Sequence, residues 1–412
     1  MTRFLHTSDW HLGATLDSVS RDEDHRLFLD HLAGLIETHR VDVLLVAGDI
    51  FDQMAPSAEA LRLYYGFLRR VSFGRLRKVV IVGGNHDSPS RLDAPAEVLD
   101  ALEVRVVGGF GSGEVGLDRF LVPIFSRDGL VESVVLAVPY IHEHRLGVRA
   151  AFSAESDAPA QLLDGFTRLY SQLCDHAAAA FPGVPLVATG HLACLGAQAG
   201  DAPQEIHRVG LLSGLPPSIF DPRISYVALG HIHRGYRVGP SRAWYCGTPI
   251  PLNAGEGLNR RRVLLVEATI PGEEATVESI PLPDFRAVLA MRGTKDSVIS
   301  QVRMLNWTQP LPPFVQVTVE VPSYEPGLSL EVSQAAPAGA RVLKVDQVLI
   351  GAGAGVEGAP APTLASLDAE EVFRLLCRSK GEEADPLLLE AFRTVRAEAA
   401  SGSESPSREG DP

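Results

Sequence analysis

The stretch Val82–Ser88, VGGNHDS, directly follows the apolar run Lys78–Val82, KVVIV. A run of Val and Ile of this length is typical of a buried strand, and the two glycines after it indicate a tight turn. Asn, His, Asp and Ser are ordinary turn residues, so this stretch alone could be a plain turn. It indicates a functional site only if other strands of the chain also end on Asp, Asn or His.

Four more apolar runs end in this way. They are Phe4–His6, before Asp9 and His11; Val41–Ala47, before Asp49 and Asp52; Leu186–Thr189, before His191; and Tyr226–Leu229, before His231 and His233. Between the runs lie segments with apolar residues at helical spacing, at 22–40, 61–68 and 162–173. This alternation predicts an α/β core with sheets covered by helices. Since ligands of such sheets bind beyond the carboxyl ends of the strands, we expect the five clusters to meet at one edge.

The residue types in these clusters predict a metal site. Imidazole, carboxylate and amide oxygen suit a divalent ion such as Mn, Fe or Zn, and no Cys belongs to the set. Seven ligands are too many for one ion and suit two. If Asp49 bridges, one ion would bind Asp9, His11, Asp49 and His233, and the other would bind Asp49, Asn85, His191 and His231. The weakest of these assignments is His191, because His142, His144, His176 and His207 are possible rivals.

Two further residues are candidates for catalysis. Two divalent ions can clamp the oxygens of a phosphoryl displacement. We expect His86 to face the phosphate and protonate the leaving oxygen as a general acid, with Asp52 holding its ring by a hydrogen bond. A lone Asp-x-His or Gly-His occurs by chance in many proteins, so the prediction depends on all five clusters together.

Composition limits the partners. The chain has 412 residues and a net charge of -14, which disfavours gripping nucleic acid by bulk electrostatics, so any such contact must be local. The basic runs Arg75–Lys78 and Arg260–Arg262 could contact phosphates or could equally be solvated faces. The four scattered cysteines disfavour a zinc ribbon and a disulfide framework. No apolar run is long enough for a membrane span and no signal peptide is visible, so we expect a cytoplasmic location.

The motifs Asp-x-His, Gly-Asp-x-x-Asp, Gly-Asn-His-Asp, Gly-His and Gly-His-x-His, in this order, resemble the calcineurin-like metallophosphoesterase superfamily over about the first 270 residues. Within it the chain is similar to the bacterial SbcD nucleases, through Leu5–Gly13 (LHTSDWHLG), Ala47–Asp52 (AGDIFD) and Tyr245–Leu252 (YCGTPIPL). The resemblance implies a two-sheet sandwich flanked by helices. It also implies a Mn-dependent nuclease, with two Mn²⁺ per chain, that acts on duplex DNA ends as an exonuclease and on single strands or hairpins as an endonuclease. By the same resemblance, the protein would be a homodimer packed through helices near 22–40 and 57–71, and would work with the ATPase SbcC.

The rest of the chain predicts further parts. Strand patterns at Ala287–Met291, Phe314–Val321 and Arg341–Ile350, with a helix from Lys295 to Leu305, indicate a small α+β capping domain. We expect a phosphoesterase domain at 1–280, the capping domain at 281–350, a Gly- and Ala-rich linker at 351–366, a helix pair at 367–400 and a disordered tail at 401–412. By resemblance, the helix pair would bind the SbcC ATPase.

Two alternatives to a nuclease stay open. One is a phosphoesterase for small diesters or nucleotides, and the other is a binding scaffold that has lost catalysis. All seven candidate ligands are present, which disfavours the scaffold. The sequence does not identify the DNA-contacting residues.

Overall fold

The computed structural model describes residues 2–110, 116–146, 158–194, 214–350, 388–389 and 391–393. It divides the chain into two units, Met1–Ile350 and Gly351–Pro412. The expected linker at 351–366 and tail at 401–412 lie outside the described residues. So does the expected helix pair at 367–400, apart from Leu388, Leu389 and residues 391–393, which are helical. The domain boundaries drawn from the sequence therefore stay predictions.

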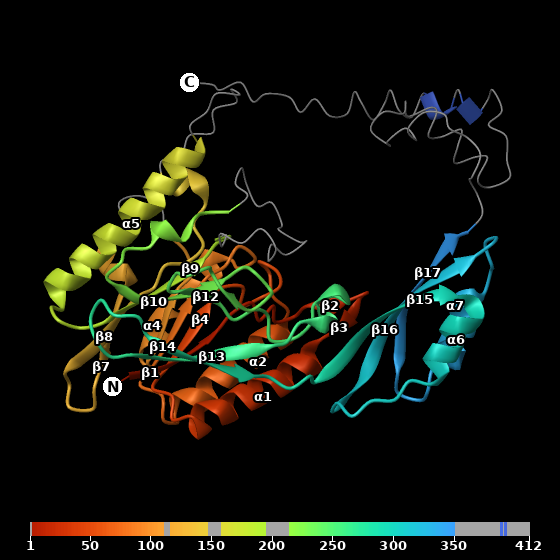
Figure 1. Cartoon of the computed structure of the whole chain (residues 1–412), viewed down its shortest axis with the longest axis horizontal. Coiled ribbons are helices and arrows are strands. Elements are labelled where there is room, and N and C mark those ends of the chain that lie inside the picture. Colours follow the sequence, from red (N-terminus) through yellow and green to blue (C-terminus); the bar gives the residue numbers. More distant parts are fainter. Residues whose placement is uncertain are drawn as a thin grey trace, which may run out of the picture. The chain divides into compact units, whose positions relative to one another are not determined.

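Two six-stranded sheets form the body of the first unit (Figure 1). The first has the order β14-β13-β1-β4-β5-β6, in which β1, β4, β5 and β6 are parallel and β13 and β14 pair antiparallel. Its strands are β1 (Thr2–Thr7), β4 (Val43–Ala47), β5 (Lys78–Val82), β6 (Val104–Val107), β13 (Arg262–Ala268) and β14 (Thr276–Pro281). The strand predicted from the opening stretch is β5.

The second sheet has the order β11-β12-β10-β9-β8-β7. Its four middle strands, β12, β10, β9 and β8, are parallel, and both edge strands are antiparallel. Its strands are β7 (Leu121–Phe125), β8 (Val131–Leu136), β9 (Leu186–His191), β10 (Ile224–Gly230), β11 (Tyr236–Arg237) and β12 (Ala243–Tyr245). The predicted strands before His191 and His231 are therefore neighbours in one sheet.

The pattern of side chains along β4 explains how the layers pack. Successive side chains of a strand point to opposite faces. Val43 and Leu45 pack in one cluster with residues of the second sheet, whereas Leu44 and Val46 pack with residues of α1 and α2. Both faces of the strand are buried, which accounts for its unbroken apolar run.

Helices cover the outer face of each sheet (Figure 1). On the first sheet lie α1 (Asp22–Thr38) and α2 (Ala58–Ser72), and on the second lies α5 (Ala158–Ala180), whose Tyr170 and Leu173 are fully buried. The short elements are β2 (Thr15–Leu16), β3 (Val19–Ser20), α3 (Pro89–Asp93), α4 (Ala96–Asp100), η1 (Leu117–Phe120), η2 (Glu143–Leu146), η3 (Pro217–Ile219) and η4 (Gly255–Leu258). The order helix, sheet, sheet, helix confirms the expected sandwich.

A smaller parallel sheet follows, with the order β15-β16-β17. It consists of β15 (Arg286–Thr294), β16 (Leu311–Val321) and β17 (Arg341–Leu349), with α6 (Lys295–Arg303) and α7 (Leu328–Ala335). Val298 and Val302 of α6 and Val332 of α7 form a core with the middle strand. The sequence analysis found the strands and α6 but missed α7, whose eight residues are too few for a clear periodic pattern.

A buried ion pair joins the small sheet to α1. Arg286 on β15 lies 3.1 Å from Asp24, and its guanidinium lies 4.0 Å from the ring centroid of Phe314. Arg21 also contacts Asp24, at 2.9 Å.

Within the described ranges, no helix has both the length and the apolar character that crossing a membrane requires.

Candidate metal centre

The candidate ligands lie where five parallel strands end. Asp9 and His11 follow β1, Asp49 follows β4, and Asn85 follows β5, and these three strands are neighbours in the first sheet. In the second sheet, β9 ends on His191, and His231 and His233 follow the adjacent strand β10. The carboxyl ends of both sheets therefore supply the cluster, as the strand-end rule predicts.

The backbone at four of the seven positions is left-handed. The φ angles of Asp9, His11, Asp49 and His231 are 51°, 48°, 49° and 95°. For a residue other than Gly this conformation costs on the order of 1 kcal/mol or more, and it persists only where the surroundings enforce it. Here the loops after β1 and β4 hold each other, through hydrogen bonds from Asp9 N to Gly48 O and from His11 N to Asp49 O, both 3.0 Å.

One part of the cluster gathers around Asn85. Its Oδ1 lies 3.0 Å from His191 Nε2 and 2.9 Å from His231 Nδ1. His191 Nε2 also lies 3.2 Å from Asp49 Oδ2. The other ring nitrogen of His191, Nδ1, lies 2.9 Å from the Ala47 carbonyl oxygen, which accepts only a hydrogen. Nδ1 of His191 therefore carries the hydrogen, and Nε2 is the nitrogen that can bind a metal ion.

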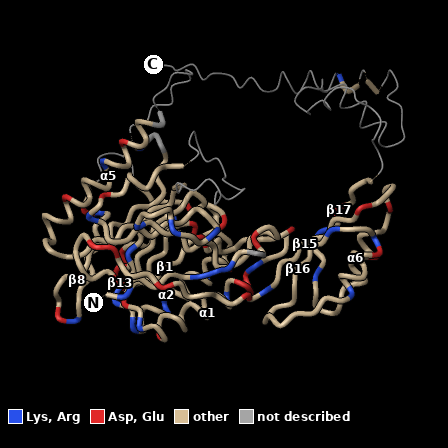
Figure 2. Tube along the Cα trace, in the orientation of Figure 1, with Lys and Arg blue, Asp and Glu red and all other residues tan. Residues whose placement is uncertain are grey.

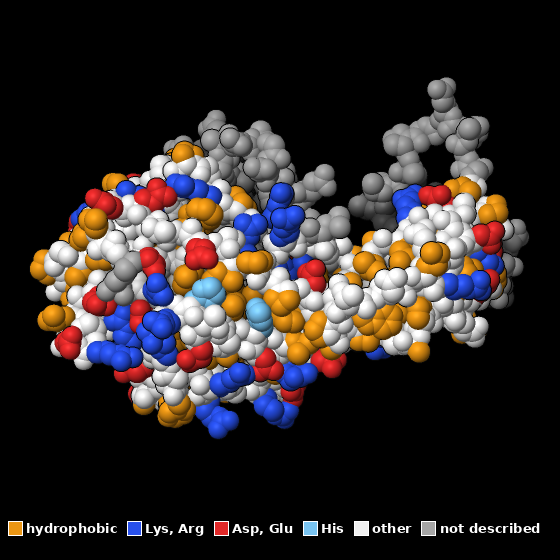
Figure 3. Space-filling model, turned by 60° about the horizontal axis from the view of Figure 1, so that its bottom comes forward, with side chains coloured by type: hydrophobic (Ala, Val, Ile, Leu, Met, Phe, Trp, Pro, Cys, Tyr) orange, Lys and Arg blue, Asp and Glu red, His pale blue; other side chains and the backbone are white. Residues whose placement is uncertain are grey.

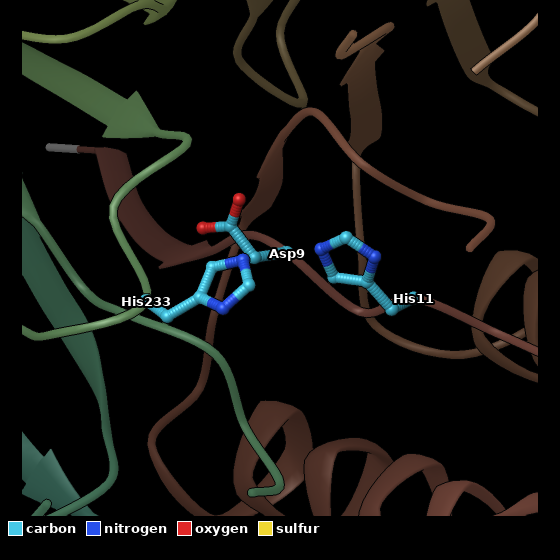
Figure 4. Close-up of side chains that lie close together, drawn as sticks. All are labelled: Asp9, His11 and His233. Atoms are coloured by element: carbon cyan, nitrogen blue, oxygen red, sulfur yellow. The ribbon is translucent and has the colours of Figure 1, made fainter. Parts of the chain in front are cut away.

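The other part of the cluster contains Asp9, His11 and His233, which point toward one another (Figure 4). Each offers one donor atom, and these atoms all lie within 4.8 Å of one another. Donor atoms of Asp9, Asp49 and His191 meet the same limit. Asp49 Oδ2 is also 3.6 Å from His11 Nε2, so this carboxylate reaches both parts of the cluster.

The residues fit divalent cations. Asp9 and Asp49 are at most 2% exposed, and burying two carboxylates side by side requires compensating positive charge. Burial raises the pKa of Asp9 although His191 and His233 lower it. Burial also raises the pKa of Asp49, but His191, His11 and the main-chain N–H of His86 together outweigh it, so the pKa of Asp49 is lowered. Nδ1 of His11 faces the Asp52 carboxylate, whereas Nε2 has no hydrogen bond in the described part of the chain and is the ring nitrogen that can bind an ion.

Glycines allow the ligands to approach. A Cβ on Gly48 would lie 2.1 Å from Nδ1 of His191, and Gly48 has a φ of 87°. A Cβ on Gly84 would lie 2.1 Å from Oδ1 of Asp49. Since both distances are far below contact distance, the two turns after β4 and β5 require Gly.

His86 lies at the exposed edge of the cluster. Its ring centroid is 4.9 Å from that of His11, and its main-chain N donates to Asp49 Oδ1 at 2.9 Å. Asp52 contacts the His86 ring, as expected, but through its main chain and not through its carboxylate. His86 Nδ1 instead lies 2.9 Å from the main-chain oxygen of Asp52, because the Asp52 carboxylate points to His11 Nδ1, 3.3 Å away.

The sequence analysis missed two carboxylates that hold the site. Asp87 accepts hydrogen bonds from the main-chain N of Gly84, Ile50 and Phe51, at 2.8, 3.0 and 2.9 Å, and so ties the turn after β5 to the loop after β4. Glu256 Oε1 lies 2.9 Å from His233 Nδ1. Asp87 belongs to the Gly-Asn-His-Asp motif and could have been singled out, whereas Glu256 lies in no motif that we recognised.

The rival histidines lie elsewhere or outside the described residues. His176, on α5, pairs with Asp118 at 2.6 Å, and His142 is exposed. The side chain of His144 and the whole of His207 are outside the described residues. His191 thus stays the preferred candidate at its position.

Several side chains of the basic runs form ion pairs with acidic neighbours. Basic and acidic residues are interspersed along the chain (Figure 2). Arg77 pairs with Glu132 at 2.8 Å, and Lys78 pairs with Glu103 at 2.5 Å. Arg261 is buried and donates to the main-chain oxygen of Glu256 at 2.7 Å, while Arg260 beside it is exposed. The run 75–78 therefore has less charge to offer to a phosphate than its composition suggests.

The chain is similar to known proteins over most of its described length. A family model described as calcineurin-like phosphoesterase matches residues 2–235, more than half of the chain. The chain is 39% identical over 258 residues to the SbcD subunit of the SbcCD nuclease of Rhodobacter capsulatus, a match that covers 62% of this chain and 63% of that protein. It is 33% identical to the SbcD subunit of Escherichia coli, with 78% of both chains covered, and 30% identical to that of Bacillus subtilis, with 71% and 72% covered.

Proposed function

The chain belongs to the calcineurin-like phosphoesterase family, and from this premise we propose that it is a metal-dependent DNA nuclease of the SbcD type. The observation that carries the proposal is the convergence of Asp9, His11, Asp49, Asn85, His191, His231 and His233 at one edge of two sheets, with His86 beside them. The three relatives compared with the chain are all named as nuclease subunits.

We propose two Mn²⁺ ions per chain, with Asp49 shared. Asp9, His11, Asp49 and His233 would hold one ion, and Asp49, Asn85, His191 and His231 would hold the other. When bound, such ions polarise a phosphodiester and activate water for attack. The turn after β5 supports this arrangement, because the main-chain N of His86 donates to Asp49 Oδ1 and keeps this carboxylate in place.

His86 would supply the proton to the leaving oxygen. The Asp52 carbonyl accepts only a hydrogen, so Nδ1 of His86 must carry one. Nε2 is then left for the substrate, and a protonated ring donates its hydrogen from there. The side chain is exposed, so a DNA strand can reach it.

Degradation of end-labelled linear duplex DNA tests the proposal. We expect digestion with Mn²⁺ and none with chelator, and a loss of about 10²- to 10⁴-fold for His86→Leu with its metal content kept. His176→Leu is the matched control, since this ring lies on α5 and pairs only with Asp118 among the contacts of the described residues. Hydrolysis of bis-p-nitrophenyl phosphate without any cleavage of DNA would favour the small-diester enzyme instead.

We further propose that the chain is one component of an assembly with an SbcC-type ATPase, bound through residues 367–400. The support is the name that the three relatives share, which makes each of them one component of an SbcCD nuclease. For a DNA nuclease of this kind we propose a cytoplasmic location. Co-purification tests the contact: the full chain should retain the ATPase, and the compact unit ending at Ile350 should not.

We also propose a homodimer packed through α1 and α2. Figure 3 turns the α1 side of the molecule forward and shows basic, acidic and apolar side chains side by side. A cavity of about 160 Å³ between the two helices is lined by Leu29, Leu63 and Phe67 together with Arg26, Asp30, Arg62, Gly66 and Arg70. A surface with both charges beside apolar groups can complement itself across a twofold axis. In sedimentation, Leu63→Glu should be monomeric and Leu130→Glu, on the exposed loop after β7, should match the wild type.

A further inference from the structure

Glu256 lies on η4, between β12 of the second sheet and β13 of the first sheet in the sequence. It is only 5% exposed, which is uncommon for Glu unless the carboxylate has partners. Its Oε1 lies 2.9 Å from Nδ1 of His233, one of the candidate metal ligands. The contact is thus between a buried carboxylate and the ring nitrogen of His233 that faces away from the centre of the cluster.

The surroundings of Glu256 fix this carboxylate in position. Oε2 accepts a hydrogen bond from the main-chain N of Leu252, and Oε1 accepts one from Asn253 Nδ2, both at 2.9 Å. Arg261 Nη2 donates to the main-chain oxygen of Glu256 at 2.7 Å. A Cβ on the next residue, Gly257, would lie 2.5 Å from the carbonyl oxygen of Val288, so η4 packs closely on β15.

The contacts also decide which nitrogen of His233 carries the hydrogen. The other hydrogen bonds of the Glu256 carboxylate, from Leu252 and Asn253, both come from donors, so the carboxylate acts as an acceptor. Nδ1 of His233 must then donate, and Nε2 keeps its lone pair. The ring of His233 points toward Asp9 and His11 (Figure 4), with which it shares a group of donor atoms within 4.8 Å.

We propose that Glu256 is a positioning residue that sets the orientation and tautomer of His233, and thereby the affinity of the ion held with Asp9 and His11. The proposal rests on the dimetal site of the proposed function. A carboxylate behind a ligating imidazole typically changes metal affinity by about 10- to 100-fold.

The second ion offers an internal comparison. His191 is oriented by a main-chain oxygen, that of Ala47, which no side-chain substitution removes. His231 contacts Asn85 Oδ1 through Nδ1 and Asp9 Oδ1 through its main-chain N. Since Glu256 contacts neither His191 nor His231 through any hydrogen bond of the described residues, its removal should weaken one ion site and spare the other.

Mn²⁺ titration of the metal-free chain, with free Mn²⁺ measured by electron paramagnetic resonance, tests this. The wild type should bind two ions. Glu256→Ala should bind one of them about 10- to 100-fold more weakly and the other unchanged. The affinity of Glu256→Gln for the weakened ion should lie between those of the wild type and Glu256→Ala, because an amide oxygen can still accept the hydrogen of Nδ1. The matched control is Glu267→Gln on β13, whose carboxylate pairs with Arg3 at 2.8 Å.

Two results would overturn the proposal: both sites of Glu256→Ala unchanged, or both weakened equally, as a general loosening of the fold would produce. Circular dichroism in chelator checks folding, and Glu256→Gln carries the test should Glu256→Ala fail to fold. The measurement needs no DNA, so two bound ions with one weakened in Glu256→Ala would support the role of Glu256 even if the chain cleaved no DNA. A wild type that binds no ion would overturn this proposal together with the dimetal site.

Discussion

Removing the carboxylate of Asp87 should loosen the whole metal centre. Three buried main-chain N–H groups, of Gly84, Ile50 and Phe51, donate to its two oxygens. An unsatisfied buried donor costs about 1 to 3 kcal/mol. Because the turn can relax and admit some water, the cost should be less than the sum of three full penalties. We expect Asp87→Ala to lower the free energy of unfolding by about 3 to 5 kcal/mol. Asp87→Asn keeps one acceptor oxygen and should cost about 1 to 3 kcal/mol.

Urea denaturation in chelator measures these differences. Asp118→Asn is the control, since this carboxylate is 87% exposed and its loss should change stability by no more than about 0.5 kcal/mol. Asp87 joins the turn that carries Asn85 to the loop that carries Asp49, so its replacement should also weaken both Mn²⁺ sites, in contrast to Glu256→Ala. An Asp87→Ala variant as stable as the wild type, with both sites intact, would refute the reasoning.

Three other changes have expected outcomes. Gly48→Ala should abolish Mn²⁺ binding at the site of His191 in a titration, because the added Cβ would lie 2.1 Å from that ring. His6 is fully buried and burial lowers its pKa to about 3, while the unfolded chain takes up this proton near pH 6.5. The free energy of unfolding should therefore fall as pH falls below 6.5, by about 2 kcal/mol between pH 6.5 and 5. In urea denaturation at several pH values, the slope of this free energy against pH should be smaller for His6→Gln, by the equivalent of one bound proton. Arg286→Ala removes a guanidinium bonded to Asp24 and should cost about 2 to 3 kcal/mol in the same assay; no change would show that Arg21 alone compensates Asp24.

The fold and the candidate ligands could be predicted because both follow from local pattern. β4 and β5 are buried on both faces, so their apolar runs are unbroken and their ends are easy to find. Parallel strands bring their carboxyl ends to one edge, and this rule alone brought residues as distant as Asp9 and His233 together.

The contacts behind the ligands could not be predicted in the same way. Glu256 lies 23 residues after His233 on a single 3-10 turn, and only the packing of η4 against β15 brings it to the ring. The side chain of Asp52 could reach either His86 or His11, and the choice depends on its rotamer, which sequence spacing does not determine. Such contacts depend on tertiary packing and not on periodicity.

The most direct test of the account is the activity of metal-free protein on linear duplex DNA as Mn²⁺ is added in steps. Seven convergent ligands with a shared Asp49 predict that degradation rises until two ions are bound per chain and then stays constant. Saturation at one ion per chain, or no cleavage of DNA at any amount of Mn²⁺, would contradict it.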